Sequence, residues 1–360
     1  AHARRLRPAA RERHGDHGVT ASATTNISSG GGGSATVTRF IRRNGWNLTL
    51  LAVLALMFVF TKIIQPDYSM AGVSILVLAA LPYAFATAGQ SIAIIAGGID
   101  LSMAAMMTLL GVTAAALMDG QSEEFGLIAV IAVLAMGLGV GAINGLSVVI
   151  TRVPDIVVTL AFFFIWEGAA LTVMEAPGGG AAVWLKELII GTVGAEFIPE
   201  NVSQFLPKAF IVLVVMLGIV WIPLRRSRLG LSLYAIGSDK RAAHRSGVAV
   251  NRTKVASYAL AGLFAAMGGL VITMNTGIGN PVQGPYLLAS VAAAVLGGVA
   301  LSGGRGGLVG PIIAVFILRL ARQDLTLMSV DPNVAQVVEG MIMVIVVLVG
   351  ATVALRGRRS

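Results

Sequence analysis

The sequence predicts an all-α polytopic membrane protein with about ten transmembrane helices. The first observation is composition: 56% of the 360 residues are hydrophobic and only 12% are charged, whereas a soluble domain carries about 25% charged residues. The second is arrangement, because the apolar residues gather in long runs, most of them the length that spans a bilayer core of about 30 Å. Short polar segments separate these runs, so the chain is expected to cross the membrane repeatedly.

The predicted elements begin with a polar segment, 1–45, which is expected to be a flexible cytoplasmic tail. A transmembrane domain over 46–355 follows, and 356–360 is expected to be a short cytoplasmic tail. Within the domain we expect an extracytoplasmic loop at 175–207 and a cytoplasmic segment at 225–254. Stretches around 90–102 and 286–310 are short and are predicted to be broken or re-entrant. The spans are 46–63, 71–88 leading into 90–99, 100–118, 127–150, 156–174, 208–224, 255–275, 286–301, 308–323 and 334–355.

The basic residues predict that both termini face the cytoplasm. With ten spans, 21 of the 26 Lys and Arg residues fall on the inner side, as the positive-inside rule requires. The net charge of +9 is then explained by orientation, and no nucleic acid partner is expected. Acidic residues lie on the outer side: Asp67, Asp119, Glu123, Glu124, Glu175, Glu187, Glu196, Glu200, Asp324 and Asp331.

Several kinds of chemistry are excluded by the sequence. The chain has no cysteine, so it offers no disulfide framework, thiolate metal site or thiol nucleophile. Neither an HExxH zinc motif nor a GxxxxGK[ST] phosphate loop occurs. We therefore expect no cofactor, no metal site and no ATP hydrolysis by the chain itself, which is predicted not to be an enzyme.

A short motif occurs twice inside apolar surroundings. GGIDLS at 97–102 returns as GGVALS at 297–302, an offset of 200 residues. Transporters are often built from repeated halves whose interrupted segments lie near the substrate path, so the sequence predicts internally repeated halves, parallel or inverted. The candidate path or helix-break residues are Gly97, Gly98, Asp100, Ser102, Gly297, Gly298, Ser302 and Gly303.

The position of Asp100 within an apolar stretch requires an explanation, since a charge at the bilayer centre costs about 2.5–3.5 kcal/mol on insertion scales. We expect it to cap the helix 100–118, and lining the pathway is the alternative. Ser302 is expected to start the helix at 308 in the same manner.

Other polar residues lie inside predicted spans: Gln90, Asn144, Glu167, Asn275 and Glu339. Asn144 lies in a stripe of small residues at four-residue spacing, Gly137, Gly141 and Gly145, and is predicted to belong to a close helix-packing face. Glu167 and Glu339 could be proton-coupling carboxylates, because intramembrane ionisable residues are functional candidates by default.

The basic segment 225–254 contains a predicted short helix. Ser238 is a plausible N-cap, DKRAAHRS forms the helix, and Gly247 ends it. One interpretation is a loop that only orients the chain. The other is a docking helix that sits in a groove of a partner protein.

The sequence resembles the membrane permeases of ribose-type monosaccharide ABC importers over about 40–356. The resemblance is carried by AGGIDLSMAA at 96–105, YAIGSDKRAAHRSGVAVNRTK at 234–254, AAVLGGVALSGGRGGLVGPIIA at 293–314, and the apolar C-terminal span ending in RGRR. The 175–207 loop departs in composition from what is expected of the family.

The resemblance implies a multi-pass permease of the bacterial cytoplasmic membrane that translocates a monosaccharide. It also implies a second permease copy (homodimer or close paralogue), a cytoplasmic ATPase subunit that binds the ATP, and an extracytoplasmic sugar-binding protein. The acidic outer loops would engage that binding protein. The coupling residues that would contact the ATPase are Ser238, Asp239, Arg241, Ala242, Ala243, Arg245, Ser246 and Gly247.

Three alternatives stay open at the level of sequence. The nearest is a permease of the same superfamily for branched-chain amino acids or nucleosides. Another is a proton-coupled secondary transporter that uses Asp100, Glu167 and Glu339. A third is a membrane receptor or scaffold that transports nothing.

Overall fold

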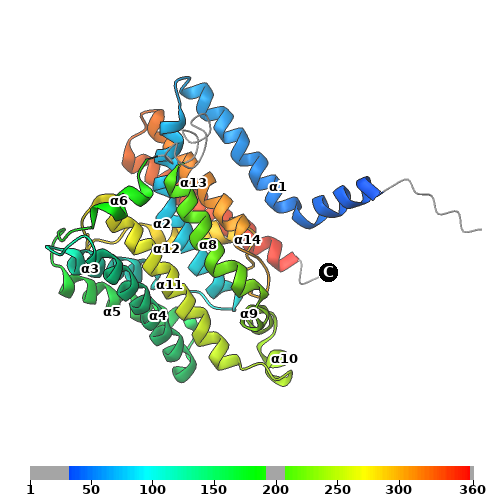
Figure 1. The fold of residues 1–360 in the computed structure, drawn as a ribbon. Coiled ribbons are helices and arrows are strands. Elements are labelled where there is room, and N and C mark those ends of the chain that lie inside the picture. The colour runs from blue at the N-terminus through cyan, green and yellow to red at the C-terminus, as the bar shows by residue number, and fades with distance from the viewer. Residues whose placement is uncertain (1–31, 192–206, 357–360) are drawn as a thin grey trace, which may run out of the picture. The chain divides into compact units, whose positions relative to one another are not determined.

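A computed structural model describes residues 32–191 and 207–356, in which the regular secondary structure is helical (Figure 1). The chain divides into a short unit, 1–44, and a large unit, 45–360. The helices are α1 (Gly32–Ile64), α2 (Met70–Ile95), α3 (Met103–Met118), α4 (Phe125–Thr151), α5 (Asp155–Val173), α6 (Val183–Ile189), α8 (Lys208–Arg226), α9 (Arg228–Ser238), α10 (Lys240–Arg245), α11 (Val250–Thr276), α12 (Tyr286–Leu296), α13 (Val309–Leu327) and α14 (Pro332–Arg356).

The predicted spans correspond to helices in the described residues, but not all of these helices can cross a membrane by length alone. Six are long and apolar enough: Asn44–Ile64 within α1, and α2, α4, α5, α8 and α11. Helices α3 and α12 and the 332–345 part of α14 are apolar but shorter. The multi-pass membrane architecture is therefore supported, and the number of ten crossings stays a prediction.

The structure differs from the predicted boundaries of the tails and the outer loop at one position, the end of the N-terminal tail. Helix α1 begins at Gly32, so 32–45 is helical, where a flexible tail was expected. Residues 1–31 and 357–360 of the predicted tails lie outside the described residues, as does the 192–206 part of the predicted outer loop.

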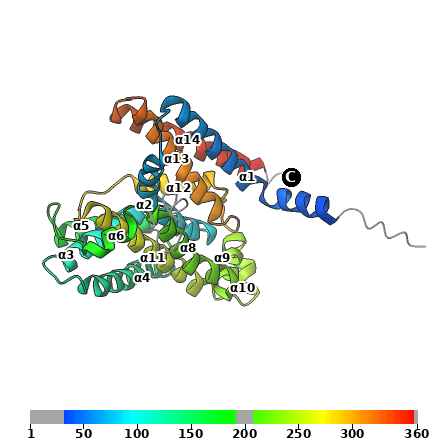
Figure 2. The same ribbon diagram turned by 45° about the horizontal axis from the view of Figure 1, so that its top comes forward.

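Helix α11 is the central helix of the large unit. It packs against α4, α2 and α3, and Figures 1 and 2 both show α4 and α11 side by side. The small-residue stripe on α4 makes this contact: a Cβ added to Gly141 would overlap the carbonyl oxygen of Tyr258, and one on Gly137 would lie 2.6 Å from that of Gly262. The predicted close helix-packing face is confirmed.

A second group of contacts joins α1, α12, α13 and α14 to one another and to α2. Helix α12 packs against α2, α13 and α14, and Leu50 of α1 packs against Ile313 and Ile317 of α13. The Thr61 hydroxyl donates to a carboxylate oxygen of Asp324 at 2.8 Å. Asp324 is only 4% exposed, so it is not available to an outer partner as the sequence suggested.

Candidate functional site

Helix α2 ends in a backbone motif that turns the chain sharply. The N–H of Gly97 donates to the carbonyl oxygen of Ile94 at 2.8 Å, and that of Gly98 donates to Ala93 at 2.9 Å. These two bonds define a Schellman closure, in which the residue after the cap takes a left-handed conformation. Gly97 supplies it with a φ of 73°, so the glycine is required by the turn.

Helix α12 ends in the same motif. The N–H groups of Gly298 and Val299 donate to Val295 and Ala294, each at 2.9 Å, and Gly298 has a φ of 90°. The structural counterpart of Gly97 is therefore Gly298, one residue later than the sequence offset of 200 predicts. We name 96–102 the first break and 297–308 the second break; whether the halves that contain them are repeats stays a prediction.

The two breaks meet at the end of α9. The N–H of Gly304 donates to the carbonyl oxygen of Ile95 at 2.9 Å. A Cβ added to Gly237 would overlap that same oxygen, and one added to Gly303 would lie 2.7 Å from the Gly237 oxygen and 3.0 Å from Gly97 Cα. We name Gly97, Gly237, Gly303 and Gly304 the glycine junction. It is a backbone-to-backbone contact, and Gly237 was not singled out from the sequence.

The two predicted helix caps are not formed as expected. Helix α3 begins at Met103 and α13 at Val309, and neither has a side-chain cap. Ser302 is exposed and precedes α13 by several residues, because left-handed glycines at 303, 304 and 306 first turn the chain. Asp100 instead closes a local turn, accepting from the backbone N–H of Ser102 at 2.9 Å and from its hydroxyl at 2.6 Å.

Buried polar side chains hold the first break from the side of α3, α4 and α5. Asp100, Ser102 and Asn144 are each 0% exposed. The Asn144 amide donates to the Ser102 hydroxyl at 2.7 Å and accepts from the indole of Trp166 at 3.0 Å. The amide of Gln90, oriented to satisfy its neighbours, donates to the backbone oxygen of Asp100 at 2.9 Å. Asn144 therefore positions the break as well as packing on it.

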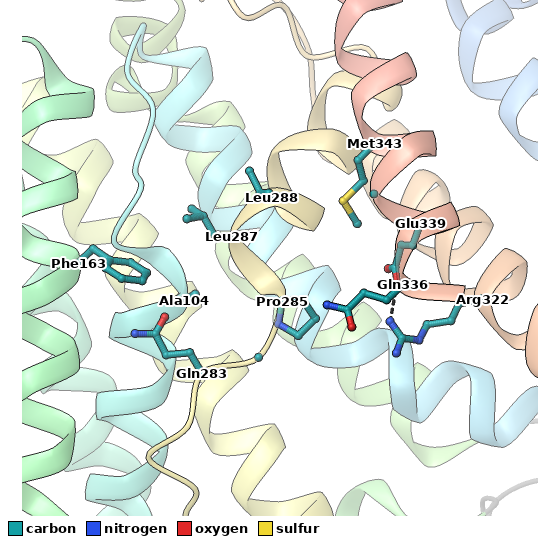
Figure 3. A pocket seen from close by; sticks show the side chains of 12 residues that line it. Ala104, Phe163, Gln283, Pro285, Leu287, Leu288, Arg322, Gln336, Glu339 and Met343 are labelled. Atoms are coloured by element: carbon teal, nitrogen blue, oxygen red, sulfur yellow. Dashed lines mark hydrogen bonds and ion pairs between the residues drawn. The ribbon is translucent and has the colours of Figure 1, made fainter. Parts of the chain in front are cut away.

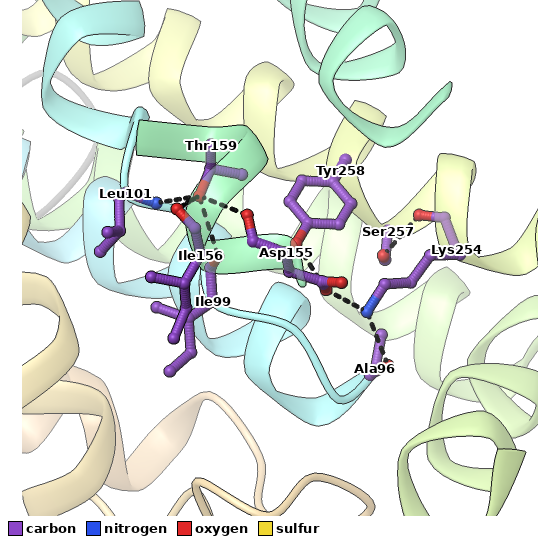
Figure 4. A network of polar contacts seen from close by, with 9 residues as sticks. All are labelled: Ala96, Ile99, Leu101, Asp155, Ile156, Thr159, Lys254, Ser257 and Tyr258. Atoms are coloured by element: carbon purple, nitrogen blue, oxygen red, sulfur yellow. Dashed lines mark hydrogen bonds and ion pairs between the residues drawn. The ribbon is translucent and has the colours of Figure 1, made fainter. Parts of the chain in front are cut away.

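An ion pair holds the first break from its other side (Figure 4). Lys254 of α11 pairs with Asp155 of α5 at 2.5 Å and donates to the carbonyl oxygen of Ala96 at 3.4 Å. The Tyr258 hydroxyl donates to the same Asp155 oxygen at 2.8 Å. A Cβ on Gly98 would overlap that oxygen, so the backbone of the break lies directly on this cluster.

Thr159 adds a further contact to the first break, and we name Asp155, Thr159, Lys254 and Tyr258 the clamp. Its hydroxyl donates to the backbone oxygen of Asp155 at 2.9 Å and accepts from the N–H of Leu101 at 3.0 Å (Figure 4). The sequence did not single out Asp155, Lys254, Tyr258 or Thr159. Lys254 was counted only as an inner-side charge, and its partner is remote in sequence.

The predicted coupling segment forms two short helices, α9 and α10. The N-cap of α10 is Asp239, not Ser238, since its carboxylate accepts from the N–H groups of Arg241 at 2.8 Å and Ala242 at 2.9 Å. The backbone N–H groups of Ala242 and Arg241 hold the pKa of Asp239 below its usual range. The stop at Gly247 is confirmed: its N–H donates to His244 at 3.1 Å, and its φ is 80°.

The coupling residues form an exposed surface around α10. Ala243 is buried and anchors the helix. The others are exposed, as docking to a partner requires: Ser238, Asp239, Arg241, Ala242, Arg245, Ser246 and Gly247. Ser238 of this surface packs directly against Gly304 of the second break, and the preceding Gly237 contacts both breaks.

Three charged residues form a second polar cluster, away from the glycine junction. Glu339 of α14 accepts from Arg319 at 3.3 Å and from Arg322 at 2.5 Å, both on α13. The Arg319 guanidinium lies 4.4 Å from the centre of the Tyr83 ring. The charge count assigned both arginines to the outer side, at the end of the predicted span 308–323; the structure places them on α13, paired with Glu339.

Sequence comparisons relate the chain to known transport permeases. The family model described as branched-chain amino acid transport system / permease component matches residues 66–347. The ribose import permease protein RbsC of Escherichia coli is 31% identical over 72% of this chain and 79% of its own length. The corresponding protein of Bacillus subtilis is 33% identical over 72% and 78%.

Another relative is the autoinducer 2 import system permease protein LsrD of Escherichia coli, 28% identical over 87% of this chain and 94% of its own length. No solved structure matches. The resemblance to ribose-type permeases is thereby confirmed, and the chain belongs to the family of branched-chain amino acid transport system permease components.

Proposed function

We propose that the chain is the transmembrane subunit of an ATP-driven importer for a monosaccharide. Two permease copies would form the path, a separate cytoplasmic ATPase would bind the exposed surface of α10, and an extracytoplasmic binding protein would deliver the sugar. Both termini would then face the cytoplasm, as the basic residues predict. Similarity to ribose and autoinducer 2 import permeases supports the substrate class.

The observation that carries this proposal is the continuity between α10 and the two breaks. A force on α10 reaches Gly237 through α9, and Gly237 contacts the backbone at both breaks without an intervening side chain. Since close-packed backbone atoms cannot be compressed, a displacement at α10 must move the ends of α2 and α12. Such a lever allows an external ATPase to drive the opening of the path.

A proton-coupled mechanism is less well supported by the three carboxylates suggested for it. Glu339 is paired with two arginines, and Asp100 accepts two hydrogen bonds from Ser102. Both carboxylates therefore already have structural partners within the chain.

The test reverses charges on α10. Arg241→Glu with Arg245→Glu should weaken co-purification with the ATPase by more than about tenfold, because each lost charge-assisted contact is worth about 1.5–3 kcal/mol. Uptake of labelled ribose should fall in parallel. The matched control is Arg225→Glu with Arg226→Glu, which reverses two exposed charges at the end of α8 and should retain both activities.

The proposal is wrong if the α10 variant still binds the ATPase and imports ribose normally. A protonophore that stops uptake while ATP is maintained would favour the secondary transporter instead. Uptake of leucine but of no sugar would favour the amino acid branch.

A further inference from the structure

A cavity of about 360 Å³ lies between α3, α5, α12, α13 and α14 (Figure 3). Its size falls within the range of small-molecule sites, about 300–1,000 Å³. The residues that define its chemistry are Phe163, Gln283, Arg322, Gln336, Glu339 and Met343. They come from four separate segments, namely α5, the loop before α12, α13 and α14, so the cavity forms where several helices diverge.

Two carboxamides line this cavity on opposite sides of Pro285. Figure 3 shows Gln336 and the Arg322–Glu339 pair on one side of Pro285, and Gln283 with Phe163 on the other. The amide nitrogen of Gln283 is buried and has no hydrogen-bond partner among the described residues. A buried donor without a partner costs about 1–3 kcal/mol, which a ligand acceptor at this position would offset.

The charged groups beside the cavity are one carboxylate and two guanidinium groups. Glu339 accepts from both arginines, and Arg319 is held on the Tyr83 ring, which itself lies 4.7 Å from the ring of Tyr286. The Arg322 side chain is 29% exposed, so it retains N–H donors for a ligand. One carboxylate against two guanidinium groups leaves a net positive charge that disfavours a cation, and the exposed donors of Arg322 can bind the hydroxyls of a neutral solute.

The remaining walls are apolar. Phe163, Leu287, Leu288 and Met343 line the cavity between the polar groups. A sugar presents C–H groups on its ring faces and hydroxyls at its edges, so it matches a site that alternates apolar surface with amides and a paired charge. A lipid tail would leave the amides and the exposed donors of Arg322 without partners.

The cavity extends away from the glycine junction, from Ala104 in the first turn of α3 toward the far end of α13. Helix α13 starts near the second break and reaches Arg322 close to its other end, and Gln336 lies in the first turns of α14. With both termini inside, this end faces the extracytoplasmic side.

We propose that this cavity is a contact site for the sugar in transit, reached from the outer side, with Gln283, Gln336 and Arg322 binding its hydroxyls. The inference rests on the proposed function and adds the place where this chain touches its substrate. Glu339 acts as a positioning residue, because it fixes the orientation of both arginines.

The test exploits the absence of cysteine from the chain. Gln336→Cys introduces a single thiol in the cavity, and Val334→Cys is the matched control. Val334 lies two residues earlier on α14, is 51% exposed and does not line the cavity. Both are placed in cells that produce the complete importer and are treated with membrane-impermeant sulfonatoethyl methanethiosulfonate. The probe is whichever of ribose, xylose, galactose and glucose the untreated wild-type importer takes up fastest.

The expected result is that both thiols are modified, but only modification of Gln336→Cys stops uptake, and the sugar slows its labelling severalfold. The proposal is overturned if modified Gln336→Cys imports at the untreated rate, if its thiol is not modified, or if the sugar leaves its labelling rate unchanged. Wild-type cells that take up none of the four sugars would instead count against the proposed function, so the two failures are distinguishable.

Discussion

The first and second breaks end their helices in the same way but are held by different means. Each follows a Schellman closure with a left-handed glycine, and each contacts Gly237 at the junction. The first is enclosed by buried polar side chains from α4, α5 and α11, including an ion pair. The second is held mainly by backbone approach, since a Cβ on Gly297 would overlap Pro311 of α13. Its side-chain contacts are neutral hydrogen bonds from Tyr234 to the Gly306 oxygen at 2.8 Å and from Trp46 to the Leu296 oxygen at 3.0 Å.

This difference indicates unequal freedom of movement. Side-chain bonds on three helices fix the first break to the centre of the bundle, where α11 packs. Around the second break Ser302 and Arg305 are exposed, and the corresponding position to Asp100 carries no carboxylate. A displacement that arrives through Gly237 should therefore move the second break more than the first.

The largest expected effect comes from removing the ion pair beneath the first break. Lys254→Met leaves Asp155 without its cation in a buried setting, which should destabilise the chain by about 4 kcal/mol. Reversible unfolding of the purified chain in detergent measures this. Replacing both partners, Lys254→Met with Asp155→Leu, should recover most of the loss, because a buried pair exchanged for apolar groups is often nearly neutral.

The control for this prediction lies on the second break. Arg305→Met should change stability by less than about 0.5 kcal/mol, as exposed positions usually do. Equal effects of Lys254→Met and Arg305→Met would show that the two breaks are not held differently.

The second largest effect is expected from a substitution at Gly237, because this residue contacts both breaks. Gly237→Ala adds a methyl group that overlaps the backbone oxygen of Ile95 and lies 2.6 Å from the Gly304 nitrogen. Forced overpacking of this kind costs about 3 kcal/mol, and it should uncouple ATP hydrolysis from uptake while the ATPase remains bound to α10. Gly139→Ala is the control, because its Cβ would meet nothing within 4 Å. Normal uptake by Gly237→Ala would remove the junction from the mechanism.

The sequence predicts helices, breaks and the exposed basic helix well because each has a local signal. Apolar runs of bilayer length mark the helices, and paired glycines mark the helix ends. The predicted N-cap of α10 was wrong by one residue: Ser238 was predicted and Asp239 is observed. Both residue types are good caps, and only the geometry selects between them. Ser302 was predicted to start the helix at 308 in the way that Asp100 was expected to cap the helix 100–118, but three left-handed glycines intervene.

The clamp and the junction could not be predicted because their partners are distant along the chain. Asp155 and Lys254 belong to α5 and α11, and one sequence contains no signal that joins them. Gly237 has no unusual φ that would mark it, and its importance comes only from the atoms that approach it. The residues of the Arg319–Arg322–Glu339 cluster were predicted in two separate spans, and nothing in the sequence indicates that those spans pair through these charges.

The smallest effect compares the two serines that the sequence motif made equivalent. Ser102→Ala removes the hydroxyl that donates to Asp100 at 2.6 Å and accepts from Asn144 at 2.7 Å. Two buried groups lose a partner, so stability should fall by about 2 kcal/mol. Ser302→Ala removes an exposed hydroxyl and should change stability by less than about 0.5 kcal/mol. If unfolding in detergent gives the two variants the same stability, the buried network does not distinguish the first break, and the unequal movement inferred for the two breaks loses its physical basis.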